Sequence, residues 1–205
     1  MSPIPFELSA HDAVGWLRNL PGESVDLVIT DPAYESLEKH RAVGTTTRLK
    51  HSKWSSNDWF AIFPNERLGE LFAEIYRVLR RNTPFFLLCD AETTFIAKPE
   101  AEKAGFRFWK PLVWDKCTIG MGYHYRARFE FILFFEKGKR RLTDRGVADI
   151  IAVPRIRGGY PAEKPAEVAE VLIRQSSAPG EIVADPFMGS GSVGVAAARL
   201  GRRFL

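Results

Sequence analysis

Short apolar runs alternate with amphipathic segments along the whole chain. The apolar runs predict buried strands over residues 6–10, 25–30, 84–88, 106–114, 129–136 and 181–185, with a further strand beginning at 202–205. Between them, apolar residues at helical spacing predict helices over residues 13–20, 68–81, 93–104, 165–178 and 193–200. Pro99 is expected to break or restart the third helix. This alternation indicates an α/β protein whose mostly parallel, seven-stranded sheet carries helices on both faces.

Two segments lack this periodicity. Residues 35–63 are polar and basic, with interleaved aromatic side chains, and residues 139–159 are basic and irregular. Long loops inside a compact domain are usually functional or disordered. Neither segment resembles a linker and no internal repeat is present, so we expect a single domain over residues 1–205 with a basic loop insertion at 35–63.

The composition is that of a globular protein with a modest excess of positive charge. Of the 205 residues, 45% are apolar and 26% charged, and the net charge of +4 permits a nucleic-acid partner without requiring one. Cys89 and Cys117 have neither metal-ligand nor disulfide spacing, so we expect no metal. No apolar run approaches the roughly 20 residues of a membrane span, and the N-terminus lacks signal-peptide features. We therefore expect a cytoplasmic protein with no membrane partner.

Two predicted strands end in an acidic residue followed by proline. Asp31-Pro32-Ala33-Tyr34 follows the run 25–30, and Asp185 opens the glycine-containing segment 185–191. Each has a plain alternative: Asp31 caps a turn whose exit Pro32 fixes, and the glycines serve tight packing. Together they predict one crevice, because open α/β sheets bind ligands at the carboxyl ends of adjacent strands.

These two segments also resemble the motifs of a known family. Residues 31–34 resemble the DPPY motif of the DNA methyltransferases that methylate exocyclic amines, and residues 185–191 resemble that family's DPFxGSG cofactor loop. The flanks at 11–31 and 160–165 are similar to further family motifs, the second to the HPxQKP box. The catalytic motif precedes the cofactor motif, as in the circularly permuted β-class. The resemblance implies a Rossmann-like methyltransferase fold.

The resemblance further implies methyl transfer from S-adenosyl-L-methionine to a base amine in DNA. The Asp31 carboxylate and the Pro32 carbonyl would accept the amine hydrogens, and Tyr34 would stack on a base swung out of the duplex. The cofactor would be bound by Asp12, Ala33, Lys164, Asp185, Pro186, Phe187, Gly189, Ser190 and Gly191. For Asp12, a plain helix cap is the alternative.

Some positions depart from the family pattern. Ala33 replaces a proline, while Tyr160 and Glu163 stand where histidine and glutamine are usual. The family pattern continues beyond the position of Leu205 with an acid that binds the cofactor ribose. Losing two charged hydrogen bonds costs several kcal/mol, at roughly 1.5–3 kcal/mol each. We therefore expect the chain as given to bind its cofactor less tightly.

Contact with DNA is expected from the variable segments. Residues 139–159 occupy the place of a short target-recognition segment, which predicts a short or relaxed target sequence. Cations and aromatic residues suit phosphate contact and base stacking, although a solvated basic loop is the alternative for 35–63. The candidates are Lys39, Arg41, Arg48, Lys50, Lys53, Trp54, Arg126, Arg128, Arg140 and Arg141.

Three functions follow in order of preference. The first is methylation of adenine N6, because the motif with Asp first is commoner for adenine in the family. The second is methylation of cytosine N4. The third is a catalytically impaired remnant that binds nucleic acid, suggested by Ala33 and the missing ribose acid. A homodimer and a restriction endonuclease partner are left open, and the origin is expected to be prokaryotic or phage.

Overall fold

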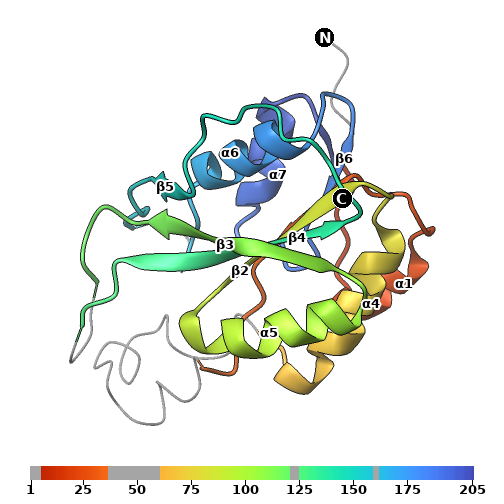
Figure 1. Ribbon diagram of the computed structural model, residues 1–205, viewed down its shortest axis with the longest axis horizontal. Helices are drawn as coiled ribbons and strands as arrows, with labels where there is room; N and C mark the ends of the chain where they lie inside the picture. Colours follow the sequence, from red (N-terminus) through yellow and green to blue (C-terminus); the bar gives the residue numbers. More distant parts are fainter. Residues whose placement is uncertain (1–5, 37–60, 121–124, 159–161) are drawn as a thin grey trace.

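A seven-stranded sheet lies at the centre of the computed structural model, which describes residues 6–36, 61–120, 125–158 and 162–205. The sheet has the order β5-β3-β4-β2-β1-β6-β7 (Figure 1). Six of these strands share one direction, and β4 runs antiparallel to both neighbours. The strands are β1 (Leu27–Thr30), β2 (Thr83–Cys89), β3 (Arg107–Asp115), β4 (Phe129–Lys137), β5 (Ile150–Ala152), β6 (Ile182–Ala184) and β7 (Arg203–Phe204). The predicted mostly parallel, seven-stranded sheet is confirmed.

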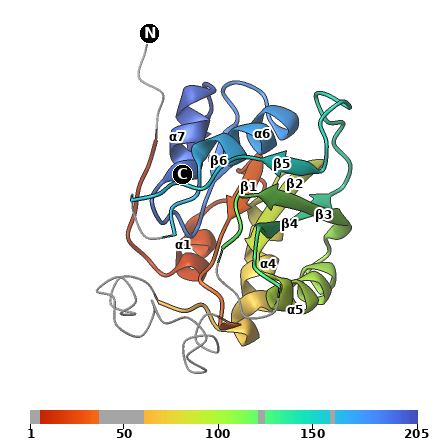
Figure 2. The same cartoon turned by 90° about the vertical axis from the view of Figure 1, so that its left-hand side faces the viewer.

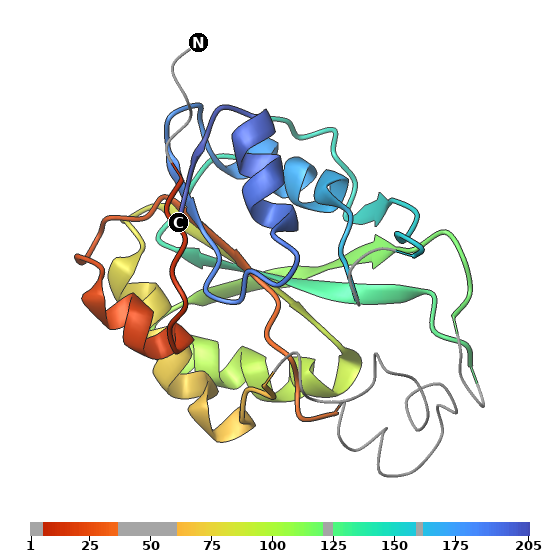
Figure 3. The ribbon, with the colours of Figure 1, turned by 180° about the vertical axis from the view of Figure 1, so that it is seen from behind.

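Helices cover both faces of the sheet. One face carries α1 (Ala13–Asn19), α4 (Leu68–Val78) and α5 (Ala91–Lys103), and the other carries α6 (Ala166–Ser176) and α7 (Ser192–Arg199) (Figures 1, 2 and 3). A single turn, η2 (Asn65–Arg67), precedes α4. Among the described residues, no helix is long and apolar enough to cross a membrane.

The central strands are buried on both faces, which explains their uninterrupted apolar runs. In β1, Val28 packs into the core beneath α4, whereas Leu27 and Ile29 pack into the core beneath α6 and α7. In β2, Phe85 and Phe86 divide in the same way between the two cores. Side chains of a strand alternate between faces, so a strand covered on both sides needs apolar residues at consecutive positions.

The boundaries of two helices follow from local chemistry. Asp90 caps α5 by accepting a 2.8 Å hydrogen bond from the Thr93 amide. The helix then continues through Pro99 to Lys103, so the predicted break at Pro99 is wrong. In α4 the residues spaced at i, i+1 and i+4, Leu71, Phe72 and Ile75, are fully buried, as the periodicity predicted.

Two predicted segments differ from the structure. Residues 6–10 form a single bridge, between Phe6 and Phe204, rather than a strand. The segment 139–159 is not irregular throughout, because β5 pairs in parallel with the end of β3. β5 has three residues, and Ile151 alone among them is buried. So short a run at the rim of a sheet has almost no periodicity to detect.

Candidate active site

The two acidic strand ends lie side by side. β1 and β6 are neighbours in the sheet, with Leu27 opposite Val183 and Val28 opposite Ala184. The Thr30 hydroxyl, at the end of β1, donates a 2.8 Å hydrogen bond to Asp185 Oδ1, directly after β6. The two loops therefore leave adjacent strands at the same edge of the sheet, as predicted.

Both carboxylate oxygens of Asp31 have a donor in the structure. The Tyr34 hydroxyl contacts Oδ1, and Lys164 Nζ contacts Oδ2. The same hydroxyl lies 2.7 Å from the Leu88 carbonyl, so its single proton serves one of the two acceptors at a time. Burial and the nearby negative charge of Asp31 raise the pKa of Tyr34 well above its usual value, so Tyr34 remains a phenol.

A second carboxylate lies on the other side of Lys164. Glu130, at the start of β4, is 3.5 Å from Lys164 Nζ through Oε2 and 2.6 Å from Lys116 Nζ through Oε1. Burial on its own raises the pKa of Glu130, but the two lysines outweigh it and the net shift is downward. Burial likewise opposes charge on Lys164, yet Asp31 and Glu130 raise its pKa. The site therefore contains two ammonium and two carboxylate groups in alternation.

Asp185 is a buried acid of different character. Its Oδ1 also accepts a 3.0 Å hydrogen bond from the Phe187 amide. Burial raises the pKa of Asp185 to about 7, against the lowering effect of its hydrogen bonds to Thr30 and Phe187. The loop then turns through Gly189 and Gly191, whose φ values of +54° and +82° favour glycine, and α7 begins directly after.

A cavity of about 100 Å³ lies beside Asp185. It is lined by residues of the segment 7–11, by Met188 of the predicted cofactor loop, and by Trp16, Phe204 and Leu205, which the sequence motifs did not indicate. Trp16 lies one helical turn after Ala13 in α1, and both residues line the cavity. Because Asp12 was a predicted cofactor residue, helical spacing from it could have identified Trp16.

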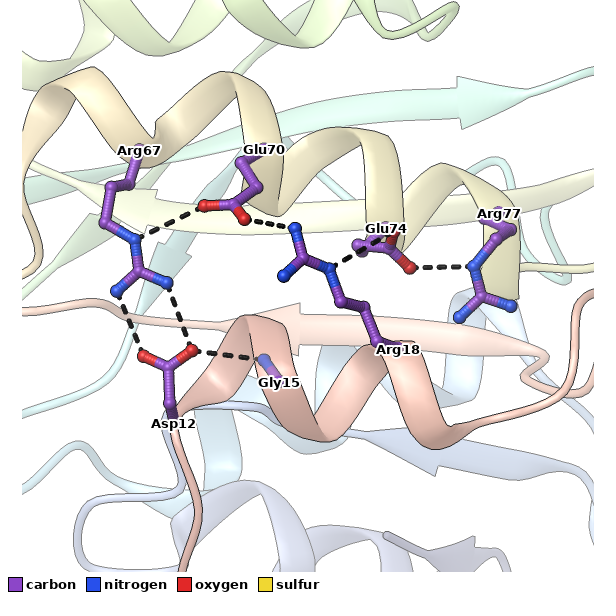
Figure 4. A network of polar contacts seen from close by, with 7 residues as sticks. All are labelled: Asp12, Gly15, Arg18, Arg67, Glu70, Glu74 and Arg77. Carbon is purple, nitrogen blue, oxygen red and sulfur yellow. Dashed lines mark hydrogen bonds and ion pairs between the residues drawn. The ribbon is translucent and has the colours of Figure 1, made fainter.

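Asp12 belongs to a polar network between α1 and α4 (Figure 4). It caps α1 by accepting a 3.1 Å hydrogen bond from the Gly15 amide, and Arg67 donates to both of its oxygens at 3.0 Å. These bonds to Arg67 and Gly15 lower the pKa of Asp12 to about 2. Arg67 also contacts Glu70, which pairs with Arg18. The contacts of the Asp12 side chain are therefore those of a helix cap. Its sequence neighbours, His11 and Ala13, line the cavity.

The arginines predicted to contact DNA fall on different edges of the sheet. Arg128 pairs with Asp115 at 2.7 Å, at the edge where β1 and β6 end. Arg126, on the same loop, donates to the Gly120 carbonyl at 2.8 Å. Arg140 pairs at 2.9 Å with Glu181, ahead of β6 and so at the opposite edge, and Arg141 follows it in sequence. Lys39, Arg41, Arg48, Lys50, Lys53 and Trp54 lie outside the described residues.

The mostly parallel α/β sheet with two acidic residues at adjacent strand ends is typical of enzymes that bind a ligand at this edge of the sheet, and comparisons with known proteins specify the class. A family profile described as DNA methylase matches residues 25–155 and 147–205. The chain therefore belongs to the N6/N4 family of DNA amino-methyltransferases. Within it, the chain is 26% identical to the DNA adenine methyltransferase YhdJ of Escherichia coli K12 over 236 residues, covering 95% of this chain and 75% of that protein.

Other relatives agree with this assignment. The type II methyltransferase M.HpaI of Haemophilus parainfluenzae is 28% identical over 228 residues, covering 95% of this chain and 67% of that protein. A DNA modification methylase of Thermus thermophilus, solved in complex with S-adenosyl-L-methionine, superposes with a TM-score of 0.71 at 25% identity, covering 98% and 86% of the two chains. The predicted family is confirmed.

S-adenosyl-L-methionine is the methyl donor of this family, so the predicted cofactor is confirmed. The residues around the cavity fit such a ligand. Asp185 offers a carboxyl group to a cationic centre, Trp16 and the neighbouring apolar side chains suit a flat ring, and the glycine turn lets the backbone approach closely.

The elevated pKa of Asp185 predicts a pH-dependent effect of Asp185→Asn on stability. A carboxyl group whose pKa rises on folding contributes stability that is complete below its unfolded pKa and is lost as pH rises through the folded value. The free energy of unfolding of Asp185→Asn, relative to the parent, should therefore increase between about pH 4 and pH 7 by on the order of a few kcal/mol. Urea unfolding across this range measures the difference. If the free energy of unfolding changes equally with pH in the two proteins, the pKa of Asp185 is not raised in the folded state.

The contacts of Asp12 predict a small effect of Asp12→Asn. Asparagine caps helices as well as aspartate does, and an exposed ion pair contributes little, so the variant should lose less than about 1 kcal/mol of stability. Its Kd for S-adenosyl-L-methionine, measured by titration calorimetry, should stay within about twofold of the parent, which is roughly 0.4 kcal/mol. A tenfold weaker Kd in a stable variant would instead identify Asp12 as a cofactor ligand.

Proposed function

We propose that this protein transfers a methyl group from S-adenosyl-L-methionine to the N6 amine of adenine in DNA. The observation that carries the proposal is the pairing of β1 with β6, which puts Asp31 beside the loop that opens with Asp185. Asp31 thus follows Thr30, which bonds to Asp185, and Asp185 lines the cavity proposed for the cofactor. Methyl transfer requires that the bound donor and the bound amine lie next to each other.

The proposed chemistry assigns a role to each group of the DPAY segment. The amine of adenine is a poor nucleophile, because its lone pair is delocalised into the ring. The Asp31 carboxylate and the Pro32 carbonyl would accept its two hydrogens, which favours a tetrahedral nitrogen and stabilises the positive charge that develops there. Tyr34, half-buried and bonded to Asp31, is the proposed stacking partner of the flipped base. The cofactor supplies the methyl group.

Adenine is preferred to cytosine for two reasons. The DPAY segment begins with aspartate, and YhdJ, which is similar along 95% of this chain, is named an adenine methyltransferase. Cytosine N4 remains the second candidate. The PvuII cytosine-N4 methyltransferase has the same fold, with a TM-score of 0.73, but at 14% identity the likeness concerns the fold alone.

We further propose that residues 1–205 act as one catalytic domain whose DNA contacts come from the insertion 35–63 and the loop that contains Arg126 and Arg128. Both arginines lie at the edge of the sheet that holds Asp31. Arg140 is a weaker candidate, because it lies at the opposite edge and pairs with Glu181. Within 139–159, the residues after β5 return to the edge that holds Asp31 and are better placed as a recognition segment.

Methyl transfer tests the proposal. DNA incubated with S-adenosyl-L-methionine carrying an isotopically labelled methyl group should yield labelled N6-methyladenine, identified by mass after digestion to nucleosides. Asp31→Ala should lower the rate roughly 100- to 1000-fold, as loss of a charge-stabilising group typically does, while still binding the cofactor. Glu102→Ala is a control, because Glu102 is exposed on α5, pairs with Lys98 and lies outside the segments proposed to contact DNA.

Each other outcome has a distinct meaning. Labelled N4-methylcytosine would support the second candidate in place of the first. DNA binding without any label in the parent protein would contradict both and favour the impaired remnant. Transfer that survives Asp31→Ala would refute the role assigned to Asp31.

A further inference from the structure

Glu130 is a carboxylate of this site to which the motifs assign no role. It lies opposite Trp114 at the start of β4, and because β4 is antiparallel its first residues reach the edge where β1 ends. The side chain of Glu130 is 24% exposed to solvent, and that of Asp31 is 25% exposed. Glu130 is therefore a second largely buried acid within reach of the same lysine.

The two oxygens of Glu130 are bound unequally. Oε1 has a close partner in Lys116 at 2.6 Å. Oε2 is fully buried and has no hydrogen-bond partner among the residues that the structure describes. A buried charged oxygen without a hydrogen bond is costly. Its nearest cation is Lys164 Nζ at 3.5 Å, which at present bonds to Asp31.

Lys164 therefore lies between two competing acceptors, and its position affects the chemistry at Asp31. With Tyr34 on Oδ1 and Lys164 on Oδ2, each oxygen of Asp31 already accepts a bond. An amine that enters at Oδ2 must share that oxygen with a charged donor, which weakens the new bond, whereas at Oδ1 it meets the neutral Tyr34 hydroxyl. A short displacement of the Lys164 ammonium toward Glu130 would satisfy Oε2 and release Oδ2.

We propose that Glu130 is a positioning residue for Asp31, which draws Lys164 toward its own Oε2 when the target amine enters and so frees Oδ2 of Asp31 to accept an amine hydrogen. This inference rests on the proposed function. Lys116 anchors the opposite oxygen of Glu130, so the acceptor stays in place while Lys164 moves.

The charge states of the groups support this exchange. The lysines hold the pKa of Glu130 below its usual value despite burial, so it competes for Lys164 as an anion. The pKa of Lys164 is raised by its two carboxylates although burial opposes this, so it moves as an ammonium and transfers no proton. Among the described residues, Tyr34, Cys89 and Asp185 are further titratable groups whose pKa Asp31 raises.

Glu130→Gln tests the proposal, because it keeps the shape of the side chain and removes its charge. The single-turnover rate of methyl transfer at saturating cofactor and DNA should fall roughly 10- to 100-fold, the scale of a misplaced catalytic group. The Kd values for S-adenosyl-L-methionine and for DNA should stay within about twofold, roughly 0.4 kcal/mol. Glu136→Gln is the matched control: the same residue type on the same strand, more deeply buried, at the opposite end. Its rate should equal that of the parent.

A double-mutant cycle separates action through Lys164 from a general effect on the fold. On the background of Lys164→Gln, adding Glu130→Gln should change the rate by less than about twofold, because the residue it acts through is gone. Additive losses would overturn the proposal, as would an unchanged rate in Glu130→Gln or a Kd for the cofactor that weakens in step with the rate. If Glu130→Gln does not fold, Glu130→Asp, which keeps the charge but shortens the side chain, should lower the single-turnover rate in the parent and change it by less than about twofold on the Lys164→Gln background. Equal losses on both backgrounds would overturn the proposal.

The same assay distinguishes this inference from the proposed function. A parent that methylates DNA, together with an equally fast Glu130→Gln, overturns the role of Glu130 alone. A parent that transfers no methyl group overturns both.

Discussion

The parallel pairing of β1 with β6 brings two carboxyl groups to one edge of the sheet, and the rest of the site is arranged around that constraint. Asp31 and Asp185 leave adjacent strands, and Thr30 joins the two strand ends through its hydroxyl. Two acids this close in a protected site cannot both carry an uncompensated charge. Burial raises the pKa of Asp185, whereas Asp31 has Lys164 as its counter-ion. The same proximity puts Asp31 beside the loop whose first residue, Asp185, lines the cavity proposed for the cofactor.

The counter-ions of the site form a chain rather than isolated pairs. Lys164 lies between Asp31 and Glu130, and Lys116 lies on the far side of Glu130. In a medium of low dielectric, an ammonium that lies between two carboxylates is attracted strongly by both. The proposed displacement of Lys164 depends on this arrangement.

The sequence was most informative where function requires rare residue combinations. The segments that begin at Asp31 and Asp185 each have a plain structural explanation when taken alone. The two together, at the ends of two predicted strands, are hard to explain by packing. Glu130 could not be identified in this way, since a glutamate at the start of a strand is common and its contacts come from elements far away in sequence. For Asp12 the motif indicates a cofactor ligand and the local sequence indicates a helix cap. The hydrogen bonds of its side chain to the Gly15 amide and to Arg67 fit the cap and leave the cofactor role to be tested by its Kd. β5 was missed because an outermost strand of three residues has too few positions to show a periodic pattern.

A crystal structure of the protein with a cofactor analogue and a DNA duplex that contains its target would test the central claim most directly. It should show the target base outside the helix, with its exocyclic amine within hydrogen-bond distance of the Asp31 carboxylate and the Pro32 carbonyl, and with Lys164 Nζ moved toward Glu130. A base bound in the site with its amine directed away from Asp31, or an analogue bound outside the cavity beside Asp185, would contradict it.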